Sequence, residues 1–312
     1  MKKKLISVVV PCYNEEGNVE RIAETLVDLF RKRLRAFNYE IIFIDNDSKD
    51  NTRYIIRRIC KKYNMVKAIF NVKNFGQFNS PYYAMLQASG DAVILMACDF
   101  QDPVTLIPEF IKAWIQGYKI AIGVRKTSTD SFLLKTIKEI YYNLIKKFSN
   151  IEQIRMFTGF GLYDRDFIEI LKKLNDPTPF LRGLVAELGY KRVEIPFEMG
   201  KRNSGKTSNN FFTLFDAAML SFTSYTKIGL RIATFIGGFA LIISFLISIF
   251  YLIYKIIFWD RFEAGMIPLL LGMLFLGAVQ IFFIGVIGEY VLAINQRSMN
   301  RPLVIEEERI NF

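Results

Sequence analysis

The chain has 312 residues, 52% of them hydrophobic, and a formal net charge of +11. It contains no histidine and three well-separated cysteines, Cys12, Cys60 and Cys98, which excludes histidine-based nucleophilic catalysis and argues against a disulfide framework or a structural zinc site. The positive charge is compatible with nucleic acid, an anionic membrane surface or an anionic substrate, and composition alone does not choose among them.

Short β-branched runs alternate with helix-length amphipathic stretches from residue 1 to residue 125. The expected strands are Leu5–Val10, Tyr39–Ile44, Val66–Phe70, Ala92–Met96 and Lys119–Gly123, and the expected helices are Val19–Phe37, Thr52–Tyr63, Ser80–Ser89 and Thr105–Gln116. This alternation predicts a doubly wound, Rossmann-like α/β fold with a mostly parallel sheet, whose ligands bind at the carboxyl ends of the strands. The polar clusters of this region follow those ends: Asn14-Glu15, Asp45-Asn46-Asp47, Lys73-Asn74 and Asp99-Phe100-Gln101-Asp102.

Two further amphipathic stretches lie in the middle of the chain. Residues 131–149 predict a lysine-bearing helix, either packed on the core or lying on a membrane surface. A strand over Tyr190–Phe197 leads into Lys201–Asn210, whose charge and Gly, Ser and Asn content predict either a mobile loop that closes over a site or a solvated basic linker. Phe211–Tyr225 follows as a second candidate interfacial helix.

Two long apolar spans, Ile232–Trp259 and Met266–Asn295, close the chain. Each exceeds the ~20 residues that a helix needs to cross ~30 Å of hydrocarbon, so we expect a two-helix transmembrane hairpin. Lys and Arg residues flank its outer ends, and the positive-inside rule therefore places both termini in the cytoplasm, at the inner membrane. The expected organisation is a cytoplasmic domain over 1–210, an interfacial helix over 211–230, the hairpin over 231–296 and a cytoplasmic tail over 297–312.

The strongest local motif is Asp99-Phe100-Gln101-Asp102-Pro103, directly after an apolar strand. A carboxylate and an amide oxygen two residues apart can both face a hard divalent cation, which takes diphosphate oxygens and water as its other ligands. The alternative is a helix N-cap and turn before Thr105–Gln116, because Asp is favoured there.

Eight motifs in this order resemble family 2 glycosyltransferases of the GT-A fold, in the branch of polyprenyl-phosphate glycosyltransferases that includes dolichol-phosphate mannose synthase and bactoprenol glucosyltransferases. They are Val8–Glu15, Ile44–Asp50, Lys73–Gly76, Gly90-Asp91, Asp99–Pro103, Phe180–Gly183, Arg202–Thr207 and Gly288–Tyr290. The resemblance covers nearly the whole chain, including both terminal apolar spans. Processive polysaccharide synthases share the early motifs but carry Gln-x-x-Arg-Trp, and neither tryptophan here follows an arginine.

The resemblance implies a role for each matching residue. It assigns Pro11, Tyr13, Glu15, Asp45 and Lys73 to the nucleotide sugar, Asp99 and Gln101 to Mg²⁺ or Mn²⁺, Arg125 and Arg202 to phosphate groups, and Lys135 to the acceptor phosphate. Arginine suits such a role because its planar fork matches phosphate oxygens bidentately.

The chain also departs from the family pattern. Asp-Ala-Asp of the family is Ala97-Cys98-Asp99 here, Ser-Gly-Phe-Arg is Thr158-Gly159-Phe160-Gly161, a preceding Asp is Arg155, and a Lys after Thr207 is Ser208. These changes put the donor sugar in doubt and leave a changed acceptor or a loss of activity open.

We therefore predict the metal-dependent, inverting transfer of one sugar from a nucleotide-diphosphate sugar to a polyprenyl phosphate at the cytoplasmic membrane face. The alternatives are another membrane acceptor or a catalytically weak scaffold subunit of a membrane glycosylation complex. Homo-oligomerisation stays open. A nucleic-acid partner is not expected, because no recognised binding module accompanies the basic charge.

Overall fold

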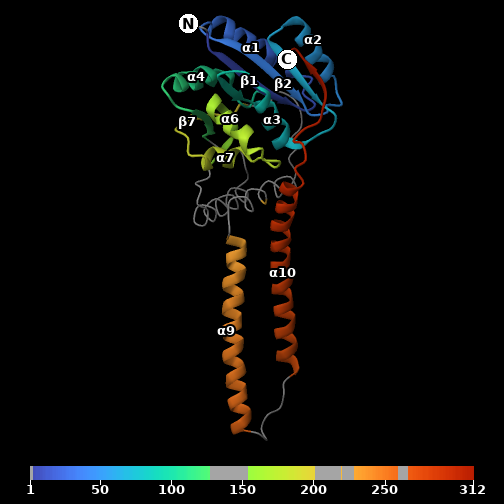
Figure 1. Ribbon diagram of the computed structural model, residues 1–312, viewed down its shortest axis with the longest axis vertical. Coiled ribbons are helices and arrows are strands. Elements are labelled where there is room, and N and C mark those ends of the chain that lie inside the picture. Colours follow the sequence, from blue (N-terminus) through green and yellow to red (C-terminus); the bar gives the residue numbers. More distant parts are fainter. Residues whose placement is uncertain (1–2, 127–153, 201–218, 220–227, 259–265) are drawn as a thin grey trace.

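The computed structural model describes residues 3–126, 154–200, 219, 228–258 and 266–312, which form an α/β domain and two long helices that project from it (Figure 1). The sheet of the domain has eight strands in the order β7-β5-β6-β4-β1-β2-β3-β8. The strands are β1 (Leu5–Cys12), β2 (Asn38–Asp45), β3 (Val66–Asn71), β4 (Ala92–Leu95), β5 (Ile120–Arg125), β6 (Phe157–Asp164), β7 (Arg192–Phe197) and β8 (Glu306–Ile310).

Most strand pairs are parallel, as the sequence predicts. Strand β1 lies between β2 and β4 and is parallel to both, β2 is parallel to β3, and β5 is parallel to β7. Strand β6 runs antiparallel to β4 and β5, and β8 runs antiparallel to β3. The expectation of an α/β fold with a mostly parallel sheet is confirmed.

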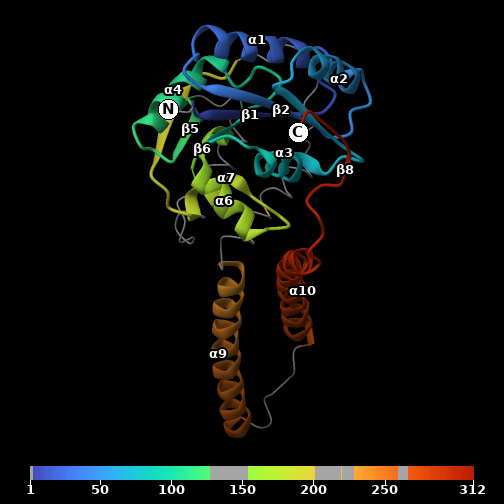
Figure 2. The same cartoon turned by 45° about the horizontal axis from the view of Figure 1, so that its top comes forward.

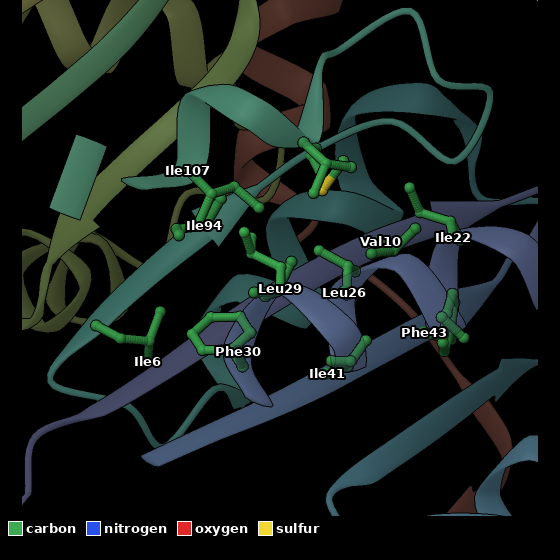
Figure 3. Close-up of a cluster of buried hydrophobic side chains, with 14 of the residues drawn as sticks. Ile6, Val10, Ile22, Leu26, Leu29, Phe30, Ile41, Phe43, Ile94 and Ile107 are labelled. Carbon is green, nitrogen blue, oxygen red and sulfur yellow. The ribbon is translucent and has the colours of Figure 1, made fainter. Parts of the chain in front are cut away.

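Helices cover both faces of the sheet, which explains why its central strands carry apolar residues on both faces. The helices are α1 (Val19–Lys32), α2 (Thr52–Lys62), α3 (Gly76–Gln87), the 3₁₀ turn η1 (Val104–Leu106), α4 (Ile107–Ile115), α6 (Arg165–Leu174) and α7 (Leu181–Glu187). Helices α1, α2 and α4 pack on the face that holds Val8 and Val10, whereas α3, α6 and α7 pack on the face of Val9. Figure 3 shows the first of these cores, where Leu26 and Phe30 of α1 meet Ile6 and Val10 of β1.

Several expected elements differ in extent. The helix expected over Val19–Phe37 ends at Lys32, because the chain turns there and the Phe37 amide donates to the carbonyl of Leu34 (3.0 Å). Phe37 still packs partly buried against the core, so it continues the apolar pattern beyond the helix end. Helix α3 begins at Gly76 rather than Ser80.

Helices α9 (Ile228–Ile257) and α10 (Met266–Ser298) occupy the two spans expected to cross the membrane, and both extend away from the same side of the domain (Figure 2). Among the described helices, one stretch, Phe275–Ser298, is long and apolar enough to cross a membrane, and Phe235–Ile247 is a shorter apolar stretch. Exposed large apolar side chains concentrate on these two helices, and such a surface marks contact with lipid or with another protein.

The chain returns to the domain after α10. Val304 is buried, the Val72 amide donates to the carbonyl of Ile305 (3.1 Å), and β8 then pairs with β3 from Asn71 opposite Glu306 to Ala68 opposite Ile310. The sequence pattern of 297–312 predicts only a cytoplasmic tail, so the strand Glu306–Ile310 is a feature that the structure adds.

Three predicted segments fall outside the described residues. They are the helix over 131–149 with Lys135, the loop Lys201–Asn210 with Arg202, and the helix over Phe211–Tyr225, of which only Met219 is described.

Candidate active site at the carboxyl edge of the sheet

The carboxyl ends of β1 to β5 lie at one edge of the sheet, because β1, β2, β3 and β4 are mutually parallel and β5, antiparallel to β6, runs in the same direction. The chain leaves β1 toward β2 and later returns to β4 on its other side, which is the switch point where open α/β sheets bind ligands. The edge brings together the predicted residues of five strand ends: Pro11, Tyr13, Glu15, Asp45, Lys73, Asp99, Gln101 and Arg125.

The segments after β1 and β2 are joined by hydrogen bonds. The Asn46 amide donates to the carbonyl of Cys12 (2.9 Å), the Asn14 amide to Ser48 Oγ (2.9 Å), and the Glu15 amide to Thr52 Oγ1 (2.8 Å). Tyr13 is 42% exposed at this junction. These hydrogen bonds hold the segment that carries Tyr13 against the segment that follows Asp45.

Asp45 is fully buried at the end of β2. Its Oδ2 accepts from the Ser48 amide (3.1 Å) and lies 3.4 Å from Arg53 Nε, whereas Oδ1 has no hydrogen-bond partner among the described residues. Burial raises the pKa of the carboxyl group, and the Ser48 hydrogen bonds and Arg53 oppose that rise. Since buried acceptors are normally satisfied, the free oxygen suits a ligand N–H or O–H donor.

Asn46 connects the β2 end to the segment that carries Lys73. Its Nδ2 donates to Asn74 Oδ1 (2.8 Å) and to the carbonyl of Gly76 (3.2 Å), and its Oδ1 accepts from the Phe75 amide (2.9 Å) and from Asn71 Nδ2 (3.0 Å). Lys73 itself is exposed, with Nζ 5.1 Å from the centre of the Phe75 ring. Asn46 thus orders the backbone that follows Lys73. The Lys73 ammonium group is exposed and can reach a ligand.

The segment after β4 turns sharply at Phe100, whose φ is 61°. Asp99 Oδ1 accepts from the Gln101 amide (3.1 Å), and buried Asp102 accepts from the Ala97 amide through Oδ2 (2.9 Å). Neither η1 nor α4 has a side-chain cap, so the N-cap part of the alternative interpretation is wrong, whereas the turn that it expected is present at Asp99–Gln101. Burial raises the pKa of Asp102 to about 6, since it outweighs the opposing Ala97 hydrogen bond and the charge of Arg125.

Asp99 and Gln101 fit a divalent cation as a partial ligand set. No group of three or more Asp, Glu, Cys or His side chains that could hold a metal occurs within the described ranges. One carboxylate and one amide oxygen suit Mg²⁺ or Mn²⁺ only if the substrate supplies phosphate oxygens, which is the usual arrangement for Mg²⁺ in phosphate chemistry. The donor chemistry therefore fits a cation bound together with a diphosphate.

Arg125 ends β5 at the same edge. Its amide donates to the carbonyl of Met156 (3.2 Å), while its buried Nε has no hydrogen-bond partner in the part of the chain that the structure describes. The position and the free donor agree with the phosphate-binding role expected for this arginine.

The backbone explains one departure from the family pattern. A Cβ on Gly161 would lie 2.6 Å from the carbonyl oxygen of Ala121, at an irregularity between β5 and β6, so the strand leaves no room for the arginine of the family pattern. Arg155 is exposed. At Ala97, where the family has an acid, the backbone amide is held by Asp102.

Comparison with known proteins identifies the family. The sequence model described as Glycosyl transferase family 2 matches residues 7–171. The chain belongs to glycosyltransferase family 2. It is thus an enzyme of the glycosyltransferase class, and the resemblance drawn from its motifs is confirmed.

Curated relatives match over almost the whole chain. The bactoprenol glucosyl transferase of Shigella phage SfV is 32% identical over 306 residues, which cover 97% of this chain and 99% of the relative. The prophage bactoprenol glucosyl transferase homolog of Escherichia coli K12 is 31% identical over 301 residues, covering 96% and 97%. A solved structure, the mannosyltransferase PcManGT of Pyrobaculum calidifontis in complex with GDP-Man and Mn²⁺, is similar at 16% identity and a TM-score of 0.48, covering 72% of this chain and 63% of that one.

Two side chains of this site, Asn46 and Asp102, have structural roles that the sequence does not predict. Asn46 and Asp102 lie inside clusters that were singled out, yet neither received a role. The sequence feature that could have indicated a role for them is their position shortly after apolar strands. Their contacts are to backbone amides and to amide side chains, which no spacing rule predicts.

Proposed function

We propose that this glycosyltransferase transfers one sugar from a nucleotide-diphosphate sugar to a polyprenyl phosphate at the cytoplasmic face of the membrane, with inversion. The observation that carries the proposal is the match, over 97% of the chain and through both long helices, to a protein named bactoprenol glucosyl transferase. Bactoprenol is a polyprenyl lipid, and the free acceptor oxygen of Asp45 beside exposed Tyr13 supports a nucleotide donor.

The donor would lie along the carboxyl edge of the sheet. Pro11, Tyr13, Glu15, Asp45 and Lys73 would bind the nucleotide, and Asp99 and Gln101 would hold Mg²⁺ or Mn²⁺. When bound, such a cation offsets the negative charge that develops on a departing nucleoside diphosphate. Arg125 would hold phosphate oxygens and so fix the reacting groups in line.

The acceptor needs no strong general base. A phosphate monoester is already largely ionised near neutral pH, because its second pKa is about 6. Its oxygen would attack the anomeric carbon as the bond from that carbon to the diphosphate oxygen breaks, with inversion. The absence of histidine from the sequence is consistent with this route. Arg202 and Lys135, both outside the described residues, are proposed as further phosphate-binding groups.

A membrane hairpin formed by α9 and α10 would keep the site next to its lipid acceptor. The chain enters α9 from the α/β domain and returns to the same domain after α10, because β1, which precedes the two helices, and β8, which follows them, belong to one sheet. An even number of membrane crossings is therefore required if the helices span the bilayer, which supports the two-helix arrangement with both termini on one side of the membrane; the positive-inside rule assigns that side to the cytoplasm.

The test is transfer from a panel of radiolabelled UDP- and GDP-sugars to undecaprenyl phosphate by purified full-length protein. With the active donor, Asp99→Ala should lower kcat/KM by ~10²-fold or more, equivalent to roughly 2.7 kcal/mol. Glu109→Ala, which removes an exposed acid from α4, is the matched control and should behave as wild type. Unchanged turnover of Asp99→Ala in Mg²⁺ and Mn²⁺ would refute the metal assignment. A complete lack of transfer by the wild type would favour the scaffold alternative.

A further inference from the structure

Strand β8, which follows α10, is linked to the buried Asp45 carboxylate of the candidate donor site through two ion pairs that share Arg53. Glu307 of β8 pairs with Arg53 of α2 (Oε2 to Nη2, 2.6 Å). The other side of the same guanidinium group lies against Asp45, with Nε 3.4 Å from Oδ2. Arg53 thus lies between two carboxylates, one of which, Glu307, is 254 positions away from it in the sequence.

The position of Arg53 matters because its positive charge, together with hydrogen bonds from Ser48, favours the ionised form of the buried Asp45 carboxylate. The Asp45 side chain is 0% exposed, and Arg53 is the cation within ion-pair distance of it among the described residues. Arg53 is itself mostly buried and lies over the ring of Phe70, 5.1 Å from its centre. If Arg53 moved away, the ionised form of the buried Asp45 carboxylate would be less stable, and the direction in which its free Oδ1 points would change.

A second ion pair on the same two elements provides an internal comparison. Glu308 of β8 accepts from Arg57 of α2 through Nε (2.9 Å) and Nη2 (2.6 Å), and Arg57 also lies over Phe70, 4.6 Å from the ring centre. Within the described residues, Glu308 is the one carboxylate at ion-pair distance from Arg57. This pair thus ties β8 to α2 without reaching the donor site.

We propose that Glu307 and Arg53 are positioning residues for the nucleotide donor, so that β8, the strand after the membrane hairpin, sets donor affinity through Asp45. This inference rests on the proposed function, since it takes Asp45 to contact the nucleotide. Arginine suits the position because its fork can contact two carboxylates at once, which a lysine ammonium does less well.

The first experiment compares Glu307→Gln with Glu308→Gln in the full-length protein in detergent. We expect Glu307→Gln to raise the Kd for UDP or GDP in the presence of Mn²⁺, measured by calorimetry, about three- to ten-fold. Donor KM should rise in parallel, with kcat at saturating donor unchanged. Glu308→Gln should stay within about two-fold of wild type in both, although both variants lose a partly exposed ion pair and should lose similar thermal stability.

The second experiment tests whether Glu307 acts through Arg53. Arg53→Met should weaken nucleotide binding at least as much as Glu307→Gln, and the double variant Arg53→Met/Glu307→Gln should bind within about two-fold of Arg53→Met alone, because coupled residues are not additive. Additive losses, or equal Kd values for Glu307→Gln and Glu308→Gln, would overturn the inference while leaving the proposed function intact. Failure of the wild type to bind UDP or GDP would overturn both.

Discussion

At the scale of single residues, the donor side of the site depends on amide side chains as much as on carboxylates. Asn46 makes hydrogen bonds to the Asn71 side chain and to the Asn74–Gly76 segment with both its donor and its acceptor atoms. It is nearly buried, so loss of these bonds would leave polar groups unsatisfied rather than exchange them for water. The position of Lys73 therefore depends on a residue that need not touch the substrate.

Asn46→Ala should raise donor KM about ten-fold, because it removes four hydrogen bonds of roughly 1 kcal/mol each, two of them to the backbone of Phe75 and Gly76, and the segment that carries Lys73 becomes disordered. Asn46→Asp is the graded control: it can still accept from the Phe75 amide and Asn71 but cannot donate to Asn74, so its KM should be intermediate. Steady-state kinetics with the active nucleotide sugar would measure both. Equal KM values for wild type and Asn46→Ala would contradict this role.

At the scale of secondary-structure elements, the opposite end of the sheet is held together by Glu40 of β2. Its nearly buried carboxylate accepts from Ser7 Oγ of β1 (2.5 Å), from Lys67 Nζ of β3 (2.6 Å) and from the Ser89 amide just before β4 (2.7 Å). Burial opposes ionisation, but the hydrogen bonds from Lys67, Ser7 and Ser89 together lower the pKa of Glu40. One side chain thus joins the first three strands to the start of the fourth.

Glu40→Gln should lower the unfolding free energy by about 2–4 kcal/mol at pH 7, because it leaves Lys67 without its buried partner. A folded-state pKa below the ordinary value of 4.5 means that the wild-type contribution is present above pH 4.5 and is lost as the pH falls through the lowered pKa. The difference between wild type and variant should therefore shrink on acidification below pH 4.5. Urea unfolding followed by tryptophan fluorescence at several pH values would measure it, and a difference that stays constant across that range would argue against an ionised Glu40.

Predictability from sequence varied among these elements for physical reasons. Strands β1 to β5 were recognised because burial on both faces requires continuous β-branched runs. Strand β6 was missed because Gly159 and Gly161, which its irregular pairing needs, are residues that strands usually avoid. Strand β8 was missed because Glu-Glu-Glu-Arg has no apolar alternation, although charge is typical of an edge strand. Asp45 and Asp99 could be located since they follow apolar runs, whereas the Arg53–Glu307 contact depends on tertiary folding.

At the scale of the whole molecule, the domain and the two long helices are connected at both ends. The chain leaves the domain before α9 and returns to it after α10, where Arg297 lies 3.9 Å from Asp176 of the domain and β8 completes the sheet. A protein connected in this way has less freedom to move its site relative to the membrane than one on a single tether. The arrangement suits an enzyme whose acceptor is confined to a plane.

The proposed topology predicts the side on which introduced cysteines react. In intact cells, Ala264→Cys, between α9 and α10, should react with a membrane-impermeant maleimide, whereas Glu307→Cys in β8 should react only after permeabilisation. Background should be low because Cys12, Cys60 and Cys98 are all buried. The reverse pattern would refute the orientation, and labelling of both sites in intact cells would refute the hairpin.

The place of β8 after the two long helices in the chain has a consequence for biosynthesis. Strand β3 leaves the ribosome more than two hundred residues before its partner β8, so its outer edge stays unpaired while the two apolar helices are being synthesised. Open strand edges promote aggregation, and domains generally fold as they emerge. The strand that completes the sheet is thus translated only after α9 and α10, so the domain cannot finish folding until both helices have been synthesised.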